Sequence, residues 1–259
     1  MIIPLVILPL LLAAVGSRAQ TGSAGKDIFI LAGQSNMAGR GGVAGGKWDG
    51  SVPPECQPNP AILRFSAQQQ WEPAHEPLHA DIDVGKTCGV GPGMSFANAT
   101  LSGGSRIGSV GLVPCAVGGT KIARWARGSD LYNRMVGRAK AALGEGGTIR
   151  ALLWYQGESD TVVLGDADSY RGHMEDLIRN VRSDLGLQDL PVIQVALASG
   201  EGSYVEKVRA AQLGISLPGV VTVDAKGLSL GQDHLHLTTS AQVQVGKMIA
   251  DAFLGNFAV

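Results

Sequence analysis

The sequence predicts a three-layer α/β/α sandwich built around a central parallel sheet. Short apolar runs rich in β-branched residues alternate with amphipathic stretches along the 259 residues. The runs are continuous rather than alternating, as expected for strands covered on both faces. Strands separated by helices imply βαβ units, which place helices on both faces of a parallel sheet. The length suits one domain, since such folds often reach roughly 250 residues.

The N-terminus carries a predicted targeting segment. Ile2–Val15 is an uninterrupted run of apolar residues and prolines, shorter than the roughly 20 residues that span a bilayer. Small residues at Ser17 and Ala19 predict cleavage after Ala19. We therefore expect a signal peptide over residues 1–19, a single domain over 20–259, and a secreted protein that leaves the membrane after cleavage. Retention in a cell wall stays open.

Five runs are predicted as strands: Ile28–Ala32, Ile107–Ala116, Ile149–Tyr155, Val192–Leu197 and Val220–Val223. Helical spacing of apolar residues predicts a helix over 170–185, with Ser169 as its N-cap and Gly186 at its end. A shorter helix is expected over Val205–Leu213. A final helix carries Thr239 and Gln242 as a capping box at its start.

The stretch Gly39–Gly93 does not follow this alternation of predicted strands and helices. It is long and rich in Pro, Gly, His and Trp, and long ordered insertions are usually functional. Export permits disulfides, so Cys56 and Cys88 in loop sequence are the plausible pair, whereas Cys115 in an apolar run is expected to be a buried thiol. Asn98 begins a glycosylation sequon, whose use depends on exposure.

Charge excludes some partner classes. The formal net charge is −1, and no long basic or acidic block is present. Nothing therefore points to nucleic acid or to an anionic membrane surface.

Polar and glycine-rich sequence follows several predicted strands. Gln34-Ser35-Asn36 follows the first, Gly118-Gly119 the second and Gln156–Asp160 the third, while Asp233–His236 follows the last. In open parallel sheets, sites lie beyond the carboxyl ends of the strands. We therefore expect these segments to meet at one edge.

Ser35 is the candidate nucleophile. A serine hydroxyl is weak until a base removes its proton. Ser35 follows a strand and opens a helical turn, where backbone N–H groups favour negative charge, and its own N–H could donate to an oxyanion. On position alone, a simple helix N-cap is the better interpretation.

Asp233 and His236 are the candidate partners of that serine. Their Asp-x-x-His spacing lets a carboxylate accept from Nδ1–H and leaves Nε2 free to face a hydroxyl. His234 competes for the role, but its spacing from Asp233 makes the geometry harder. Gly118 or Gly119 could donate a backbone N–H to the oxyanion, and Gln156 could donate its amide. The alternatives are an ordinary turn and a structural hydrogen bond.

Four blocks together resemble a known family. They are Gly33-Gln34-Ser35-Asn36-Met37-Ala38-Gly39, Val113-Pro114-Cys115-Ala116-Val117-Gly118-Gly119-Thr120, Trp154-Tyr155-Gln156-Gly157-Glu158-Ser159-Asp160 and Asp233-His234-Leu235-His236. The chain resembles the SGNH hydrolases, in the sialate O-acetylesterase-like branch with carbohydrate esterase family six, and it is most similar to the plant carbohydrate esterases of that group.

The resemblance implies a flavodoxin-like α/β/α fold and ester hydrolysis without metal or cofactor. It assigns Ser35 as nucleophile and first oxyanion donor, His236 as base and Asp233 as its partner. A glycine of the Gly118-Gly119 pair becomes the second donor.

The third block departs from the SGNH pattern Gly-x-Asn-Asp because it has no Asn. Gln156 is our substitute donor, and Glu158 is expected to hold the Ser35 or Gly118 loop by hydrogen bonds. Gln34 and Asn36 are expected to support the site.

The expected function is a secreted serine esterase that removes O-acetyl groups from a carbohydrate through an acyl-enzyme. The partner is an acetylated carbohydrate such as a cell-wall polysaccharide or a sialate; the oligomeric state stays open. Trp48, Trp71 and Trp125 could stack on sugar rings or could equally serve as packing.

Three alternatives remain. A metal hydrolase would use His75, His79, Asp233 and His236. The same fold could also support a non-catalytic sugar-binding protein or an acetyltransferase.

Overall fold

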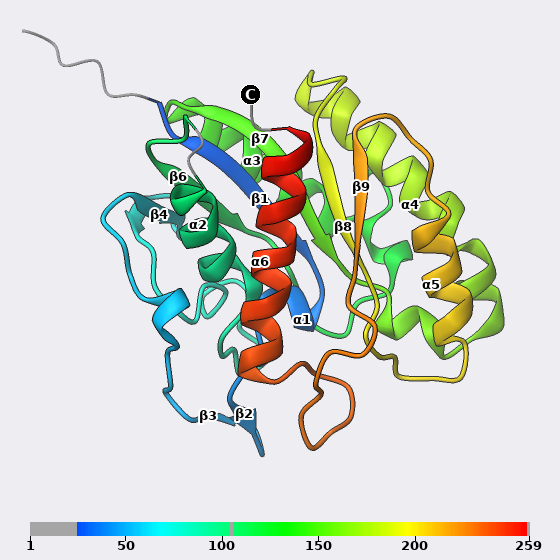
Figure 1. Ribbon diagram of the computed structural model, residues 1–259. Coiled ribbons are helices and arrows are strands. Elements are labelled where there is room, and N and C mark those ends of the chain that lie inside the picture. The colour runs from blue at the N-terminus through cyan, green and yellow to red at the C-terminus, as the bar shows by residue number, and fades with distance from the viewer. Residues whose placement is uncertain (1–24, 104–105, 258–259) are drawn as a thin grey trace, which may run out of the picture.

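A seven-stranded sheet forms the centre of the computed structural model, which describes residues 25–103 and 106–257 (Figure 1). The strand order is β5-β4-β6-β1-β7-β8-β9. Their bounds are β1 Asp27–Gly33, β4 Ile62–Phe65, β5 Trp71–Pro73, β6 Val110–Pro114, β7 Thr148–Tyr155, β8 Val192–Ala196 and β9 Val220–Asp224. All neighbours pair parallel except β4 and β5. The predicted signal peptide over residues 1–19 lies outside the described residues.

The predicted fold class is confirmed. If the five strands β1, β6, β7, β8 and β9 are numbered 1 to 5 along the chain, their order across the sheet is 2-1-3-4-5, which is the flavodoxin-like order. Strands β4 and β5 extend the sheet beyond β6. The five predicted strands are all present, and no end is shifted by more than three residues. The largest shift is at Ile107, which precedes β6, because its apolar side chain packs against the core without joining the ladder.

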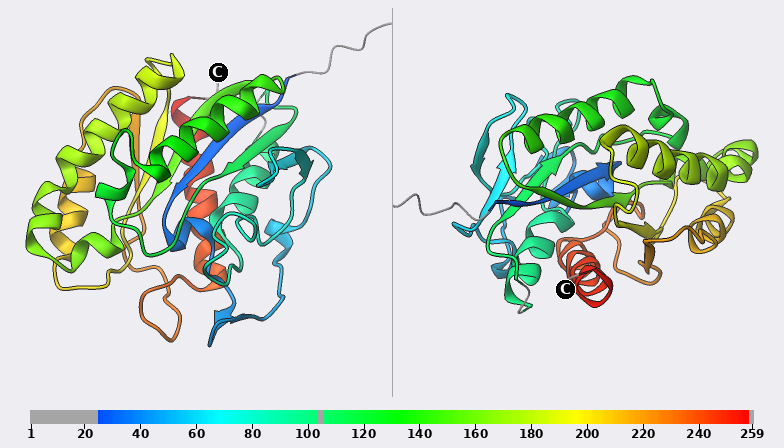
Figure 2. Two further views of the ribbon diagram at one scale, coloured as in Figure 1. Left: turned by 180° about the vertical axis from the view of Figure 1, so that it is seen from behind. Right: turned by 90° about the horizontal axis from the view of Figure 1, so that it is seen from above.

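Helices cover both faces of the sheet (Figures 1 and 2). The helices α2 and α6 lie on one face; α3 and α4 lie on the other, with α5 beside α4. Their bounds are α1 Ser35–Ala38, α2 Pro92–Ser102, α3 Asp130–Gly144, α4 Leu164–Leu185, α5 Val205–Leu213 and α6 Thr239–Asn256, with short 3₁₀ turns η1 Pro54–Cys56, η2 Ile122–Trp125 and η3 Glu158–Thr161. Among the described residues, none of these helices has the length and apolarity needed to cross a bilayer.

Aromatic side chains join the layers. Phe29 of β1 packs edge-on against Phe96 of α2 and Phe253 of α6, with ring centroids 4.8 and 5.0 Å apart. On the opposite side, Trp154 of β7 packs edge-on against Trp125 at 5.2 Å. Such pairs contribute about 0.5–1.5 kcal/mol beyond their buried area. Because Trp125 is fully buried, stacking on a sugar is excluded for this residue.

Two predicted helix starts are wrong. Helix α4 begins at Leu164, so Ser169 lies inside the helix, where its hydroxyl donates to the carbonyl of Gly165 (2.8 Å). Helix α6 is capped by Thr238, which accepts from the Ala241 N–H (3.3 Å). Gln242 is buried and points into the molecule instead of back to the cap. The predicted end at Gly186 is confirmed, with a left-handed φ of 69°.

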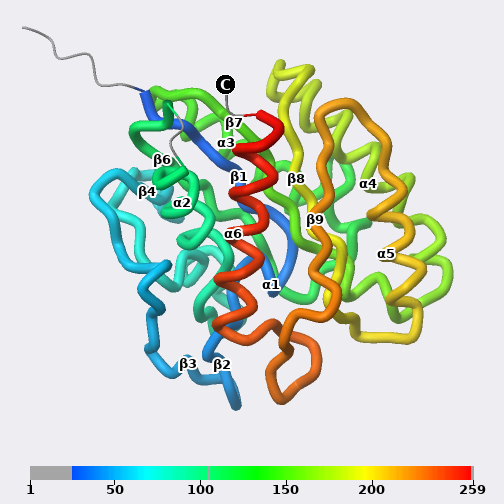
Figure 3. The backbone as a smooth tube through the Cα atoms, viewed as in Figure 1, coloured from blue at the N-terminus to red at the C-terminus, as the bar shows by residue number. Residues whose placement is uncertain are grey.

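The insertion that the sequence indicated as a long loop is partly regular. It contains the hairpin β2 (Val43–Ala44) and β3 (Lys47–Trp48), the turn η1 and the sheet strands β4 and β5. Strand β4 was missed because it is four residues long and Arg64 interrupts its apolar run. In the tube view the insertion lies along one edge of the molecule, and its hairpin β2–β3 lies near the start of α6 (Figure 3).

The predicted Cys56–Cys88 disulfide is wrong. All three cysteines are free and buried. The Cys88 sulfur accepts from Arg40 (3.4 Å), and Cys56 is buried in the turn η1, which packs against α2. The loop sequence around Cys56 and Cys88 therefore did not show whether the two cysteines pair.

The Asn98 sequon lies on α2 with its amide nitrogen engaged. It donates to the carbonyls of Glu55 and Gln57, each at 3.1 Å. Glycosylation of this nitrogen would require breaking both hydrogen bonds.

Candidate active site

The predicted segments meet beyond the carboxyl ends of β1, β6 and β7. Strand β1 stands at the point where the strand order reverses, which is where open α/β sheets bind ligands. The turn after β1 carries Ser35, and the loop between β9 and α6 carries Asp233 and His236. Figure 1 shows that loop folding back beside α1.

Ser35, His236 and Asp233 form one hydrogen-bonded chain. The His236 Nε2 lies 2.9 Å from the Ser35 Oγ, although the two residues are 201 positions apart. The His236 Nδ1 lies 2.6 Å from the Asp233 Oδ2. A carboxylate only accepts, so Nδ1 carries the proton and Nε2 accepts from the serine hydroxyl. The sequence-predicted trio is therefore brought together with the polarity that general-base catalysis needs.

Asp233 is held as an anion by its own loop. Burial alone would raise the pKa of this carboxyl. The backbone N–H groups of His236 (2.9 Å) and Leu235 (3.0 Å), and then the His236 ring, outweigh it, so the pKa is lowered. The competing residue His234 is exposed at a turn with a left-handed φ of 55°, and its ring bonds neither Ser35 nor Asp233.

Asn36 connects the serine helix to the histidine loop. Its Oδ1 accepts from the backbone N–H of Leu237 (3.0 Å), and its Nδ2 lies 3.5 Å from the carbonyl of Leu235. These two residues flank His236. The same Nδ2 donates to Glu158 Oε1 at 2.7 Å. Asn36 is fully buried, so the placement of His236 over Ser35 is anchored in the core.

Glu158 performs the supporting role expected of it, through Asn36. Burial raises the pKa of this fully buried carboxyl to about 7, against the lowering effect of the Asn36 hydrogen bond. Its second oxygen has no partner among the described residues. The group is thus poised to be protonated near neutral pH.

Gln34 ties the serine turn to the third block. Its Oε1 accepts from the Gln156 amide (3.1 Å) and from the backbone N–H groups of Gly157 (3.2 Å) and Ser159 (3.4 Å). The residues before and after Ser35 therefore fix it from two directions.

The prediction that Gln156 is an oxyanion donor is wrong. Its amide is fully buried, and its two N–H groups are shared among three acceptors: the Thr120 carbonyl (2.8 Å), Asp160 Oδ2 (2.6 Å) and Gln34 Oε1 (3.1 Å). No N–H remains to face a substrate. Gln156 therefore links the third block to Gln34 and Thr120 and does not replace the missing Asn as a donor. The sequence shows that an amide lies at the strand end, but it does not show the direction in which that amide points.

The two glycines after β6 differ in their N–H groups. Gly118 donates to Asp83 Oδ2 at 3.1 Å. The N–H of exposed Gly119, like that of Ser35, donates to no group in the described part of the chain. A Cβ on Gly118 would lie 2.6 Å from Arg40 Nη2 and 3.4 Å from the Ser35 Cβ, so a larger residue would displace the Arg40 guanidinium.

Arg40 and Asp83 belong to the site and were missed from the sequence. They form a buried ion pair beside Gly118. Arg40 also lines a cavity of about 200 Å³ together with Ser35, Gly118, Gly119, Lys86, Glu201, Leu235 and His236. In the sequence they are two of several charged residues in the Gly39–Gly93 insertion. Only the fold shows that these two side chains are buried.

The residues of the metal alternative do not assemble. Within residues 25–103 and 106–257, no group of three or more His, Cys, Asp or Glu is arranged to hold a metal ion. His79 is buried away from solvent, and burial lowers its pKa to about 3.

The two other tryptophans serve as packing. Trp71 contacts Phe65 at 4.9 Å and Lys26 at 5.2 Å, and Lys26 lies just before β1, at the other end of that strand from Ser35. Trp48 packs against the backbone of Gly89. Neither forms an open platform beside Ser35.

Comparison with known proteins agrees with this geometry. The family model "Carbohydrate esterase, sialic acid-specific acetylesterase" matches residues 25–255. A protein of Arabidopsis thaliana named "Probable carbohydrate esterase" is 59% identical over 239 residues, covering 89% of this chain and 91% of the relative. The X-ray structure of the Arabidopsis protein superposes with a TM-score of 0.87 at 58% identity, covering 90% and 99% of the two chains.

More distant structures share the fold. NanS has a TM-score of 0.72 at 18% identity, covering 90% of this chain and 97% of NanS. A carbohydrate acetylesterase from Xanthomonas citri has a TM-score of 0.61 at 21% identity, covering 90% of this chain and 56% of that enzyme. From the family model and the Arabidopsis relative, the chain belongs to the sialic acid-specific acetylesterase family of carbohydrate esterases.

Proposed function

We propose that this protein is a serine esterase that hydrolyses O-acetyl esters on carbohydrates through an acyl-enzyme on Ser35. The observation that supports it best is the continuous chain from the Ser35 hydroxyl through His236 (2.9 Å) to Asp233 (2.6 Å). The family supports a carbohydrate ester as substrate.

In the first step, His236 Nε2 takes the proton from the Ser35 hydroxyl as its oxygen attacks the acetyl carbonyl carbon. The C=O electron pair moves onto oxygen and gives a tetrahedral anion. This anion collapses by breaking the bond to the sugar oxygen, which leaves as an alcohol with the proton from His236. The acetyl group is then bonded to Ser35.

In the second step, water replaces the sugar alcohol. His236 removes a proton from water, the hydroxide attacks the acetyl carbon, and the Ser35 oxygen leaves with the proton held by His236. Acetic acid is released and loses its proton to the solvent as acetate, and the starting protonation states of the protein return. Asp233, whose pKa is lowered, stabilises the transient imidazolium in both steps.

The backbone N–H groups of Ser35 and Gly119 are the proposed oxyanion donors. Both residues line the 200 Å³ cavity, and neither N–H is used elsewhere in the described residues. One such donor contributes about 2.7–4 kcal/mol of transition-state stabilisation in a known serine enzyme.

Acetate release from a panel of acetylated polysaccharides tests the function, with Ser35→Ala as the control. Wild-type protein should release acetate in the presence of EDTA, and the variant should not. Equal release by both proteins would refute the proposal. Adding a sugar acceptor and analysing the products separates hydrolysis from acetyl transfer.

We also propose that the protein is exported, with cleavage after Ala19. The support is the apolar run Ile2–Val15 followed by small residues. N-terminal sequencing of protein recovered from the medium of an expressing eukaryotic cell should begin at Gln20. Retention of the full chain inside the cell would contradict export.

A further inference from the structure

We propose that a groove leading away from Ser35 binds a neutral sugar chain next to the acetylated residue, so that the substrate is an oligosaccharide or polysaccharide rather than a single sugar. One wall of the groove is the segment 40–55, and the other is the segment 231–247. This inference rests on the esterase function proposed above.

The groove is continuous because neighbouring cavities share their walls. The 200 Å³ cavity at Ser35 shares Arg40 and His236 with a cavity of about 520 Å³. That cavity shares Thr238 and Thr239 with a third cavity of about 700 Å³. The path therefore runs from the nucleophile past the histidine loop to the first turns of α6.

The sizes of these cavities favour a chain of sugars. Ligand pockets typically measure about 300–1,000 Å³. The cavity at Ser35 is smaller, at about 200 Å³, and suits the acetyl group with part of one ring. The 520 and 700 Å³ cavities lie beyond it, so a single acetylated sugar would leave most of the groove empty.

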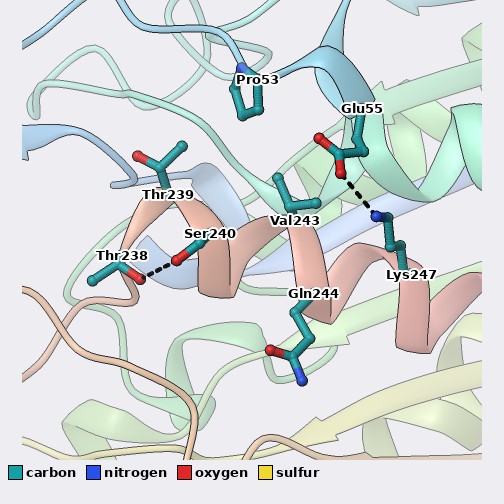
Figure 4. A pocket seen from close by; sticks show the side chains of 8 residues that line it. All are labelled: Pro53, Glu55, Thr238, Thr239, Ser240, Val243, Gln244 and Lys247. Atoms are coloured by element: carbon teal, nitrogen blue, oxygen red, sulfur yellow. Dashed lines mark hydrogen bonds and ion pairs between the residues drawn. The ribbon is translucent and has the colours of Figure 1, made fainter.

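The far cavity combines hydroxyl groups with a small apolar surface (Figure 4). Pro53 faces the side of α6 that carries Thr239 and Val243, while Ser240 presents a hydroxyl group at the helix start, 3.2 Å from the hydroxyl of the capping residue Thr238. Sugars offer hydroxyl donors and acceptors around an apolar C–H face, and hydroxyl side chains can both donate and accept. The lining therefore matches carbohydrate better than a purely apolar ligand.

The charges of the groove favour a neutral chain. Lys247 is paired with Glu55 at 2.9 Å, and Arg40 is paired with Asp83. Among the described residues that line the two larger cavities, no cation is left unpaired, whereas Asp49 makes no ion pair. Lys86 lines the cavity at Ser35 and a cavity of about 220 Å³ beside the histidine loop, but neither of the two larger cavities. A row of uronate carboxylates would therefore meet no unpaired cation in the two larger cavities.

The test compares substrate length with a blocked groove. Ser240→Trp places a large ring in the far cavity without touching the catalytic residues. Ser169→Trp is the matched control, since Ser169 is also an exposed helical serine but lies on α4. Thr239→Val removes one hydroxyl without adding volume. Each protein is assayed on p-nitrophenyl acetate and on acetylated xylo-oligosaccharides and oligogalacturonates of one to six units.

In the wild-type protein and Ser169→Trp, kcat/KM should rise about tenfold along the xylose series, the equivalent of one or two added neutral hydrogen bonds. It should stay flat along the galacturonate series. Ser240→Trp should lose the rise and Thr239→Val should reduce it, while both keep wild-type rates on p-nitrophenyl acetate. Their unchanged rate on that small ester also shows that the variants are folded.

A flat xylose series in the wild-type protein, a steeper galacturonate series, or an unchanged rise in both groove variants would overturn the inference. Failure of the wild-type protein on every ester, including p-nitrophenyl acetate, would instead refute the esterase function.

Discussion

The two halves of the proposed catalytic site are held in opposite ways. Ser35 stands on a short turn after β1, and Gln34 and Asn36 on either side of it are fully buried. The histidine loop is a surface segment, in which the Asp233 side chain is about half exposed. The nucleophile is therefore fixed by the core, whereas the base and its carboxylate lie in a loop that must be held in place.

This difference shows where the precision of the site originates. The histidine loop is closed by the Leu230–Leu237 bridge and fastened to the core by Asn36, which bonds on both sides of His236. A motif of three successive residues thus supplies the nucleophile, ties it to the third block and anchors the base. Breaking each part in turn should give a graded series of losses.

Removing the nucleophile should have the largest effect. Ser35→Ala should lower kcat on p-nitrophenyl acetate by roughly 10⁵- to 10⁶-fold, as for triad serines elsewhere. Because the methyl group fits the same space, the melting temperature should hardly change. Ser169→Ala on α4 is the control, and retained activity in Ser35→Ala would refute the role of Ser35.

Substitutions of His236 and Asp233, the two residues in the histidine loop, should lower activity by different amounts. His236→Ala removes the base and should approach the loss seen for Ser35→Ala. Asp233→Asn should lose less, about 10²- to 10⁴-fold, because the base remains but its tautomer and imidazolium are less well stabilised. Comparing kcat/KM for the two variants checks this order. A larger loss for Asp233→Asn would contradict the assigned roles.

Cutting the anchor should have an intermediate effect. Asn36→Ala leaves the Leu237 N–H and Glu158 without their partner, and about 1 Å of misplacement can cost roughly 10²-fold in rate. We expect kcat to fall by about that factor, with a lower free energy of unfolding.

Ser199→Ala is the matched control for Asn36→Ala. It also removes a hydrogen bond to the Leu235 carbonyl but leaves the hydrogen bonds of Asn36 intact. It should change kcat only a few-fold on the same substrate. Equal losses in the two variants would mean that Asn36 is not the main anchor of the loop.

The smallest effect on activity should come from Glu158→Gln, which changes stability instead. The pKa of Glu158 is raised from 4.5 to about 7 by burial, so the folded state binds a proton that the unfolded state releases. Its contribution to stability is therefore lost as the pH rises from about 4.5 to 7. Above pH 7, the variant should be more stable than wild type by on the order of 3 kcal/mol.

Urea unfolding at pH 5 and pH 8 measures this difference. The variant keeps an acceptor for Asn36 and should show a shallower decline with pH, although Asp160, with a pKa raised to about 6, retains part of the slope. Parallel declines in both proteins would contradict a buried, protonatable Glu158.

The sequence predicted the sheet from local signals, whereas the proposed trio followed from four blocks that together resemble a known family. Continuous apolar runs mark β1 and β7, and Ser35 lies in a block that resembles known esterases. It did not predict what depends on direction or distance. Packing between distant segments alone determines the orientation of the Gln156 amide, whether Cys56 and Cys88 pair, and the burial of Arg40.

The same limit applies to helix ends and to strand β4. Ser169 and Thr239 are good capping residues, but the helices begin where tertiary contacts place them. The insertion contributes β4 through pairing with β6, which no local pattern in four residues specifies.

Covalent trapping tests the central claim most directly. The protein is treated with diethyl p-nitrophenyl phosphate, which reacts with an activated serine, and is then digested and analysed by mass spectrometry. We predict a single diethylphosphoryl group on Ser35 in the wild-type protein and almost none in His236→Ala. Labelling of another residue, or equal labelling of Ser35 in both proteins, would contradict activation of Ser35 by His236.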